Sequence, residues 1–207
     1  MPFHETDDGC RLAYEVGGLP DAPALVLSNS LGTSRAMWDA QMDRLADRFR
    51  VLRYDTRGHG ESDAPDAAYN IDRLGRDALS LMDAAGITRA DVCGVSLGGM
   101  TALWLGEHAP GRVNRLVLAN TGARIGSNDM WNERIRGVTT EGLEALADSV
   151  MARWFTAGFR AAEPEIVERL RKGLCRTPVE GYAGCCAARS EERRVGKECR
   201  SRWSPYH

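Results

Sequence analysis

A serine between two closely spaced glycines is the residue best suited to covalent chemistry in this sequence. Ser96 lies in Gly94-Val-Ser-Leu-Gly98, after an apolar, β-branched run and before apolar residues at helical spacing that continue to His108. A strand that turns this abruptly into a helix holds the serine in a strained conformation and needs small neighbours. The hydroxyl then lies at a helix N-terminus, which stabilises a developing oxyanion. We predict that Ser96 is a nucleophile, with chance occurrence among 22 glycines as the alternative.

The loop after the first buried strand is expected to supply a second oxyanion donor. Ala24–Leu27 is a continuous apolar run, and the small polar turn 28–33 leads from it toward a helix over residues 37–46. In serine hydrolases built on a parallel sheet with alternating helices, a backbone N–H of this loop completes the oxyanion hole. We assign that donor to Leu31, and the alternative is an ordinary strand-to-helix turn.

A sheet with alternating helices is predicted to position these residues. A hairpin is expected over 2–4 and 10–16, and Asn70 is expected to cap a helix that runs to Ala85. Further buried strands are predicted at 50–54 and 113–120. Strands that alternate with amphipathic helices indicate an α/β fold, a mostly parallel sheet with helices on both faces.

Beyond Gly122 the pattern becomes purely helical. Helices are predicted over 128–136, 140–155, 163–174 and 178–188, which favours a helical lid over the sheet. Ser127 or Asn128 is expected as one N-cap, and Thr139 or Thr140 as another. Four aromatic residues either line a pocket or form the lid core, namely Trp131, Trp154, Phe155 and Tyr182. The expected units are a core over residues 1–123 and a lid over 124–188.

The turn 55–62 follows the strand predicted at 50–54 and carries charged residues and a histidine. His59 is a candidate catalytic base, but a structural loop is the favoured interpretation. In that interpretation Asp55 and Arg57 hold the loop through charge-assisted hydrogen bonds.

Composition excludes several classes of function. The 207 residues include 27 basic and 29 acidic side chains, so the net charge of −2 gives no nucleic-acid footprint. The N-terminus has no signal-peptide pattern and no apolar run is long enough to span a membrane, so a cytoplasmic protein is expected. Six cysteines without metal-type spacing predict reduced thiols and no metal or cofactor, and Cys185-Cys186 is read as two small apolar residues in a helix rather than a redox pair. The oligomeric state is left open.

These motifs together resemble the α/β-hydrolase family, and within it the 3-oxoadipate enol-lactonases. The general features are Asp55-Thr-Arg-Gly-His-Gly-Glu-Ser62 and Gly94-Val-Ser-Leu-Gly-Gly99, and the more specific ones are Ser28-Asn-Ser-Leu-Gly-Thr33 and Trp131-Asn-Glu-Arg-Ile135. The resemblance implies that Ser96 is the nucleophile and that the N–H groups of Leu31 and Leu97 bind the oxyanion. It also implies a small-molecule substrate, an enol-lactone with a free carboxylate.

A buried carboxylate needs a cation, and Arg134 is the candidate. It lies three residues after Trp131, so both side chains share one face of the first lid helix. The guanidinium fork matches a carboxylate, and we predict that Trp131 and Arg134 contact the substrate. An exposed lid arginine is the alternative.

The sequence departs from the hydrolase pattern downstream of the serine, where an acid and then a histidine are expected. The aspartates there, Asp129 and Asp148, fall in lid helices, and His108 lies twelve residues along the helix of Ser96, about 18 Å away. His207 is the last residue. We find no triad acid or histidine in the chain.

Residues 189–207 mix charges without apolar periodicity and are interpreted as a vector-like tail, with a genuine basic tail as the alternative. The sequence therefore predicts a C-terminally shortened hydrolase that lacks roughly two βα units and is inactive as it stands. Alternatives are another hydrolase of this fold, such as an esterase, a carbon–carbon bond hydrolase or a perhydrolase-type enzyme. A non-catalytic binding module on the same scaffold is a further alternative.

Overall fold

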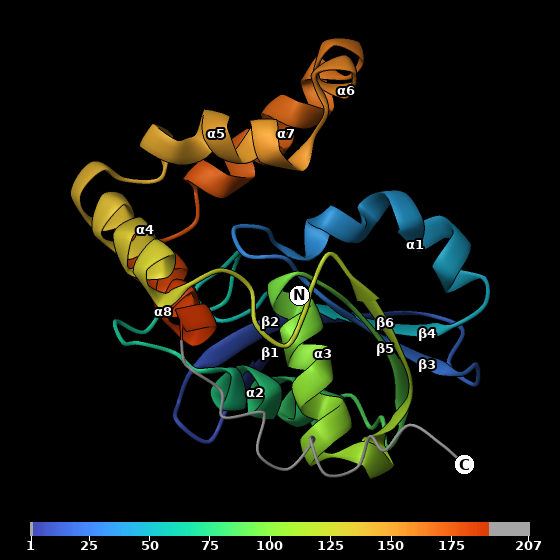
Figure 1. The fold of residues 1–207 in the computed structure, drawn as a ribbon. Helices are drawn as coiled ribbons and strands as arrows, with labels where there is room; N and C mark the ends of the chain where they lie inside the picture. The colour runs from blue at the N-terminus through green and yellow to red at the C-terminus, as the bar shows by residue number, and fades with distance from the viewer. Residues whose placement is uncertain (1, 191–207) are drawn as a thin grey trace, which may run out of the picture.

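Six strands form one sheet in the order β1-β2-β4-β3-β5-β6, in a computed structural model that describes residues 2–190 (Figure 1). The two strands β1 and β2 form an antiparallel hairpin, β2 pairs antiparallel with β4, and β4, β3, β5 and β6 are parallel. The bounds are Phe3–Glu5 for β1, Arg11–Gly18 for β2, Ala24–Ser28 for β3, Arg50–Tyr54 for β4, Ala90–Val95 for β5 and Val113–Ala119 for β6. The predicted hairpin and mostly parallel sheet are confirmed.

Helices cover both faces of this sheet, as predicted. In Figure 1, α1 (Asp39–Ala46) lies on one side of the strands, and α2 (Ile71–Ala84) and α3 (Leu97–His108) lie on the other. Side chains alternate accordingly, because Leu25 and Leu27 of β3 pack toward Trp38 near α1, whereas Val26 joins the larger core with α2 and α3.

The helix starts follow local capping chemistry. The Asn70 side chain accepts a hydrogen bond from the N–H of Arg73, so this predicted N-cap is confirmed. The helix predicted over 37–46 is preceded by a 3-10 turn, η1 (Arg35–Trp38), whose N-cap is Ser34. The short turn was not predicted because it lacks an apolar repeat of its own.

Helices α4 to α8 follow β6 and stand beside and above the sheet (Figure 1). Their bounds are Asn128–Glu141 for α4, Glu144–Trp154 for α5, Ala157–Ala162 for α6, Pro164–Cys175 for α7 and Val179–Ser190 for α8. Helix α4 packs against α8, and α5 packs against α7. None of the helices in residues 2–190 is long and apolar enough to cross a membrane.

Helices α4, α5 and α6 differ from prediction. Ser127 caps α4 as expected, but α4 continues past residue 136, so Thr139 and Thr140 lie inside it and cap nothing. The hydroxyl of Thr139 bonds instead to the carbonyl of Ile135. Helix α5 begins only after Gly142, whose φ of 79° is not helical and ends α4. Helix α6 was not predicted.

Helix α8 extends beyond the boundary expected at residue 188. It includes Arg189 and Ser190, so the first residues of the predicted tail are helical. Residues 191–207 of that tail lie outside the described residues. The cysteines Cys185 and Cys186 are buried free thiols in this helix, which confirms their interpretation as small core residues.

Strand β6 forms an edge of the sheet within the described residues, as predicted. Its apolar sequence resembles that of a central strand, yet Val117 is 55% and Leu118 41% exposed. Such an edge presents unpaired backbone groups and apolar side chains to solvent.

Candidate active site

Ser96 occupies a sharp turn between β5 and α3. Its φ of 55° and ψ of −108° lie outside the regions that most residues adopt. A Cβ at Gly94 would lie 2.2 Å from the carbonyl oxygen of Gly98, and a Cβ at Gly98 would lie 2.2 Å from that of Ser28. Both positions therefore require glycine, and the strained elbow predicted from the motif is present.

The two predicted oxyanion donors come from two neighbouring segments of the chain. Leu97 is the first residue of α3, and Leu31 lies in the loop after β3. The N–H groups of both residues are without a hydrogen-bond partner among the described residues. The first turn of α3 is held to this loop, because the N–H of Gly98 donates to the carbonyl of Asn29 over 2.9 Å. Both N–H groups thus remain available to a ligand.

Asn29 anchors the loop that carries Leu31. Its side-chain amide is fully buried, donates to the carbonyl of Tyr54 over 2.6 Å and accepts from Nε1 of Trp38 over 2.8 Å. A buried amide with both ends bonded fixes the local backbone, because losing either partner leaves a polar group unsatisfied.

His59 is a second anchor of the same loop. Its Nε2 accepts the N–H of Gly32 over 2.9 Å, and its Nδ1 lies 3.2 Å from the carbonyl oxygen of Arg57, which assigns the proton to Nδ1. Complete burial lowers the pKa of His59 to about 4, so the ring is neutral. The favoured structural interpretation is confirmed, although the bond to Gly32 was not predicted.

Charged residues hold the turn 55–62 as expected. The buried carboxylate of Asp55 accepts the N–H groups of Arg35 and Glu61, and it pairs with the Arg35 guanidinium. Arg57 bonds to Asp77 through two hydrogen bonds of 2.6 and 2.8 Å. These contacts hold the turn in shape, as the structural interpretation predicts.

A cavity of about 720 Å³ opens between this loop, Ser96 and the lid. All four predicted aromatic residues line it, namely Trp131, Trp154, Phe155 and Tyr182. Trp131 and Tyr182 also pack in the core, at 4% and 2% exposure, so the two interpretations of these residues both apply.

Arg134 faces the same cavity. Its Nη1 donates to the hydroxyl of Tyr182 over 3.3 Å, and its guanidinium carbon lies 5.5 Å from the centre of the Trp131 ring. The structure therefore brings Arg134, Trp131 and Ser96 to one cavity. No Asp or Glu of the described residues lines it.

Arg189 is a site residue that sequence reasoning placed in a tail. Its Nη1 donates to Oγ of Ser96 over 3.0 Å, and its guanidinium stacks 4.3 Å above Trp131. The side chain is only 6% exposed, and burial lowers its pKa to about 10. The spacing of Tyr182, Cys186 and Arg189, four and then three residues apart, was the available signal that one helix face continues.

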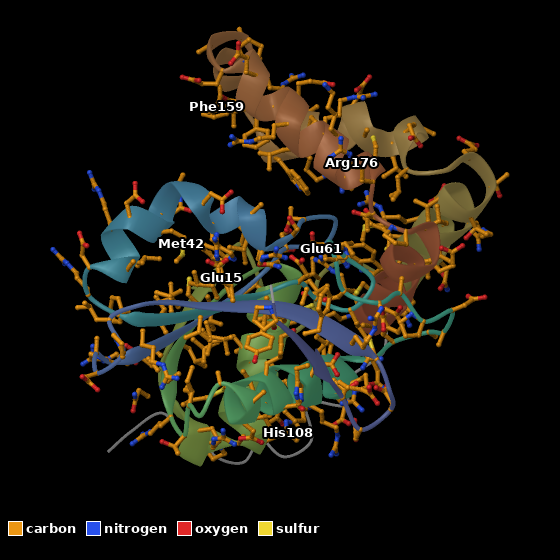
Figure 2. The ribbon with its side chains drawn as sticks, turned by 180° about the vertical axis from the view of Figure 1, so that it is seen from behind. Glu15, Met42, Glu61, His108, Phe159 and Arg176 are labelled. Atoms are coloured by element: carbon orange, nitrogen blue, oxygen red, sulfur yellow. The ribbon has the colours of Figure 1, made fainter. Side chains whose placement is uncertain are left out.

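The three histidines in residues 2–190 bond elsewhere. His59 holds Gly32, His4 bonds to Ser80 over 2.5 Å, and His108 stacks on Trp104 with ring centres 4.6 Å apart. Figure 2 shows His108 at the end of the molecule opposite to the lid, where Phe159 and Arg176 lie. His207 lies outside the described residues.

The two downstream aspartates also lie away from Ser96. Asp129 is in the first turn of α4, and Asp148 is exposed and pairs with Arg171 over 2.8 Å. Within the described residues, the side-chain hydrogen bond at the Ser96 hydroxyl comes from a cation, which cannot accept the serine proton.

The chain is similar to known hydrolases over most of its length. Residues 23–142 match the model of the alpha/beta hydrolase fold family. The chain is 46% identical to 3-oxoadipate enol-lactonase 2 of Acinetobacter baylyi, over 92% of this chain and 73% of that protein.

Two solved structures extend this similarity. The enol-lactonase from Burkholderia xenovorans LB400 superposes with a TM-score of 0.89 at 46% identity, over 91% of this chain and 73% of the other. A thermophilic esterase from Thermogutta terrifontis superposes with a TM-score of 0.86 at 26% identity, over 92% and 73%. The chain is short relative to these proteins, and it belongs to the α/β-hydrolase family.

Proposed function

We propose that this chain is a serine hydrolase of the enol-lactonase type that acts on a lactone bearing a free carboxylate, the 3-oxoadipate enol-lactone of aromatic catabolism. The observation that carries the proposal is one cavity bounded by Ser96 on its strained turn, by Leu31 of the oxyanion loop and by the Arg134 guanidinium. The similarity to 3-oxoadipate enol-lactonases supports this substrate over a simple ester.

In the proposed reaction, Oγ of Ser96 bonds to the lactone carbonyl carbon. The N–H groups of Leu31 and Leu97 stabilise the oxyanion of the tetrahedral intermediate. The ring C–O bond then breaks, and the released enolate takes up the proton that the Ser96 hydroxyl has lost, first as an enol and then, once the proton has moved to carbon, as the ketone. Water cleaves the Ser96 ester and releases a second carboxylate, so that the product is a dicarboxylate.

Arg134 recognises the carboxylate already present on the lactone. An unpaired carboxylate in a closed cavity costs several kcal/mol, and a guanidinium fork satisfies it with two hydrogen bonds. The Trp131 ring and the Tyr182 hydroxyl hold that guanidinium at the cavity wall.

Residues 2–190 supply the nucleophile, the oxyanion donors and the carboxylate site, and the acid–base pair is the missing element. Because triad members act as a unit, an enzyme without its base retains only ~10³ to 10⁴-fold acceleration over water. We therefore expect slow turnover by the chain as it stands. The proposed chemistry needs no metal or cofactor. The described cysteines are free thiols, which fits the proposed cytoplasmic location.

The test supplies the base from solution. Arg189→Ala removes the guanidinium beside Ser96 and leaves room for imidazole, which accepts the serine proton when neutral. In this variant, hydrolysis of 3-oxoadipate enol-lactone is compared with hydrolysis of its neutral methyl ester and of simple aryl esters. A clear preference for the aryl esters would overturn the lactone assignment.

Arg134→Met tests the carboxylate site in the same assay. We expect a loss of at least tenfold on the acidic lactone, about 1.4 kcal/mol, and little change on its methyl ester. Arg136→Met is the matched control, because Arg136 is exposed on the same helix. Equal losses on both substrates would show that Arg134 does not bind the carboxylate.

A further inference from the structure

The cavity beside Ser96 carries positive charge that the described protein does not neutralise. Arg134, Arg153 and Arg189 line it, and no carboxylate of residues 2–190 does. Arg153 is exposed at the end of α5, so water screens its charge. Arg134 and Arg189 lie further from solvent, and the charge of Arg134 contributes to lowering the pKa of Arg189.

Arg189 is the less satisfied of these two guanidinium groups. Its Nη1 donates to Ser96, but its Nε is buried without a hydrogen-bond partner among the described residues. A buried cation without a carboxylate is unfavourable, because burial removes its hydration and no opposite charge of the described protein compensates for that loss. A ligand carboxylate that accepts from the guanidinium corrects this deficit.

The two guanidinium groups are placed for one ligand. Both lie against the ring of Trp131, at 4.3 Å for Arg189 and 5.5 Å for Arg134, so their carbons are within about 10 Å of each other. Near Ser96 the N–H groups of Leu31 and Leu97 are also available to an anion. At the other end the Tyr182 hydroxyl lies beside Arg134.

We propose that Arg189 and Arg134 form the two ends of a binding site for a short aliphatic dicarboxylate in this cavity. One carboxylate bonds to Arg189 next to Ser96, and the other bonds to Arg134. The proposal deepens the proposed function and rests on it for the choice of ligand, because opening of the lactone produces such a dicarboxylate. The chain then holds a product-like anion without any chemical step.

The test is isothermal titration calorimetry of the full chain with adipate and with hexanoate, which has one carboxylate. We expect adipate to bind at least tenfold more tightly than hexanoate. Arg189→Met is expected to weaken adipate binding at least tenfold, to the level of hexanoate, and Arg134→Met is expected to act alike from the other end. Arg136→Met, on the exposed side of the helix that carries Arg134, is expected to change neither the affinity for adipate nor that for hexanoate.

Equal affinities for adipate and hexanoate would overturn the proposal, and so would an unchanged affinity for adipate in Arg189→Met. Thermal melts of each variant establish that it is folded, and if Arg189→Met does not fold, Arg134→Met alone decides. The outcome is separate from that of the hydrolysis assay. If the chain hydrolyses the lactone with imidazole but does not prefer adipate, the proposed function stands and this inference fails. If the chain prefers adipate but does not hydrolyse the lactone, the dicarboxylate site stands and the proposed function fails.

Discussion

Nε2 of the buried His59 accepts the backbone N–H of Gly32 over 2.9 Å, and this bond joins two loops that are far apart in sequence. Gly32 follows Leu31 directly, so the ring of His59 sets the position of a proposed oxyanion donor. His59 therefore acts as a positioning residue, because it bonds to the backbone of the loop that carries Leu31 and does not contact the reacting atoms.

His59→Ala is expected to destabilise the chain by about 2–4 kcal/mol, because it leaves the Gly32 N–H unsatisfied and opens a cavity. Urea unfolding followed by circular dichroism measures the change. His108→Ala is the matched control, because His108 is partly exposed and stacks on the surface of Trp104. Equal effects of the two substitutions would contradict the role given to His59.

The stability of the chain is expected to depend on pH through His59. Burial lowers its pKa from 6.5 to about 4 in the folded chain, so the unfolded chain takes up the proton first as the pH falls. The contribution is complete above pH 6.5 and is lost as the pH falls toward about 4, amounting to about 3 kcal/mol. His59→Gln removes this titration. Unfolding free energies at pH 7 and pH 4.5 that fall equally in both proteins would refute the assignment.

Gly98→Ala tests the requirement for a small residue beside the nucleophile. The new Cβ would lie 2.2 Å from the Ser28 carbonyl oxygen, which is backbone and cannot move aside cheaply. We expect a loss of about 3 kcal/mol or more in unfolding free energy. Gly137→Ala in α4 meets no atom within 4 Å and is expected to stabilise by up to about 1 kcal/mol. A tolerated Gly98→Ala would mean that the elbow is less tight than the structure shows.

Asp77→Ala is expected to be far more harmful than an equivalent change at the surface. Arg57 is buried and would retain its two bonds of 2.9 and 3.2 Å to the half-exposed Asp8, so the loss is expected near the lower end of about 3–5 kcal/mol. Asp72→Ala breaks an exposed pair with Arg76 and is expected to have little effect. Chemical denaturation of both variants provides the comparison, and similar losses would exclude a structural role for the buried pair.

The sequence was sufficient for the elements whose physical cause is local. The strand and turn around Ser96, the cap at Asn70 and the hairpin before β3 each follow from a few neighbouring residues. Contacts between distant residues could not be predicted in this way. The bond from Gly32 to His59 and the contact of Arg189 with Ser96 depend on tertiary packing. The turn that contains His59 has no sequence feature that indicates a bond to Gly32.

Lid boundaries were the least predictable part. Thr139 and Thr140 have the residue type of a helix cap, but α4 continues through them because Val138 is fully buried on its inner face. Composition indicates no helix at Arg189, but the last turn of α8 contains this residue and places it beside Ser96. In both cases packing of one helix face outweighed the local signal.

The central claim is that Ser96 attacks a lactone carbonyl, and imidazole rescue tests it most directly. In Arg189→Ala, release of 3-oxoadipate from its enol-lactone is measured as neutral imidazole is increased, after subtraction of the rate without protein. We predict a rise of at least tenfold that disappears when Ser96→Ala is added, because imidazole then has no serine hydroxyl to deprotonate. An equal rise in the variant that also lacks Ser96 would contradict the account.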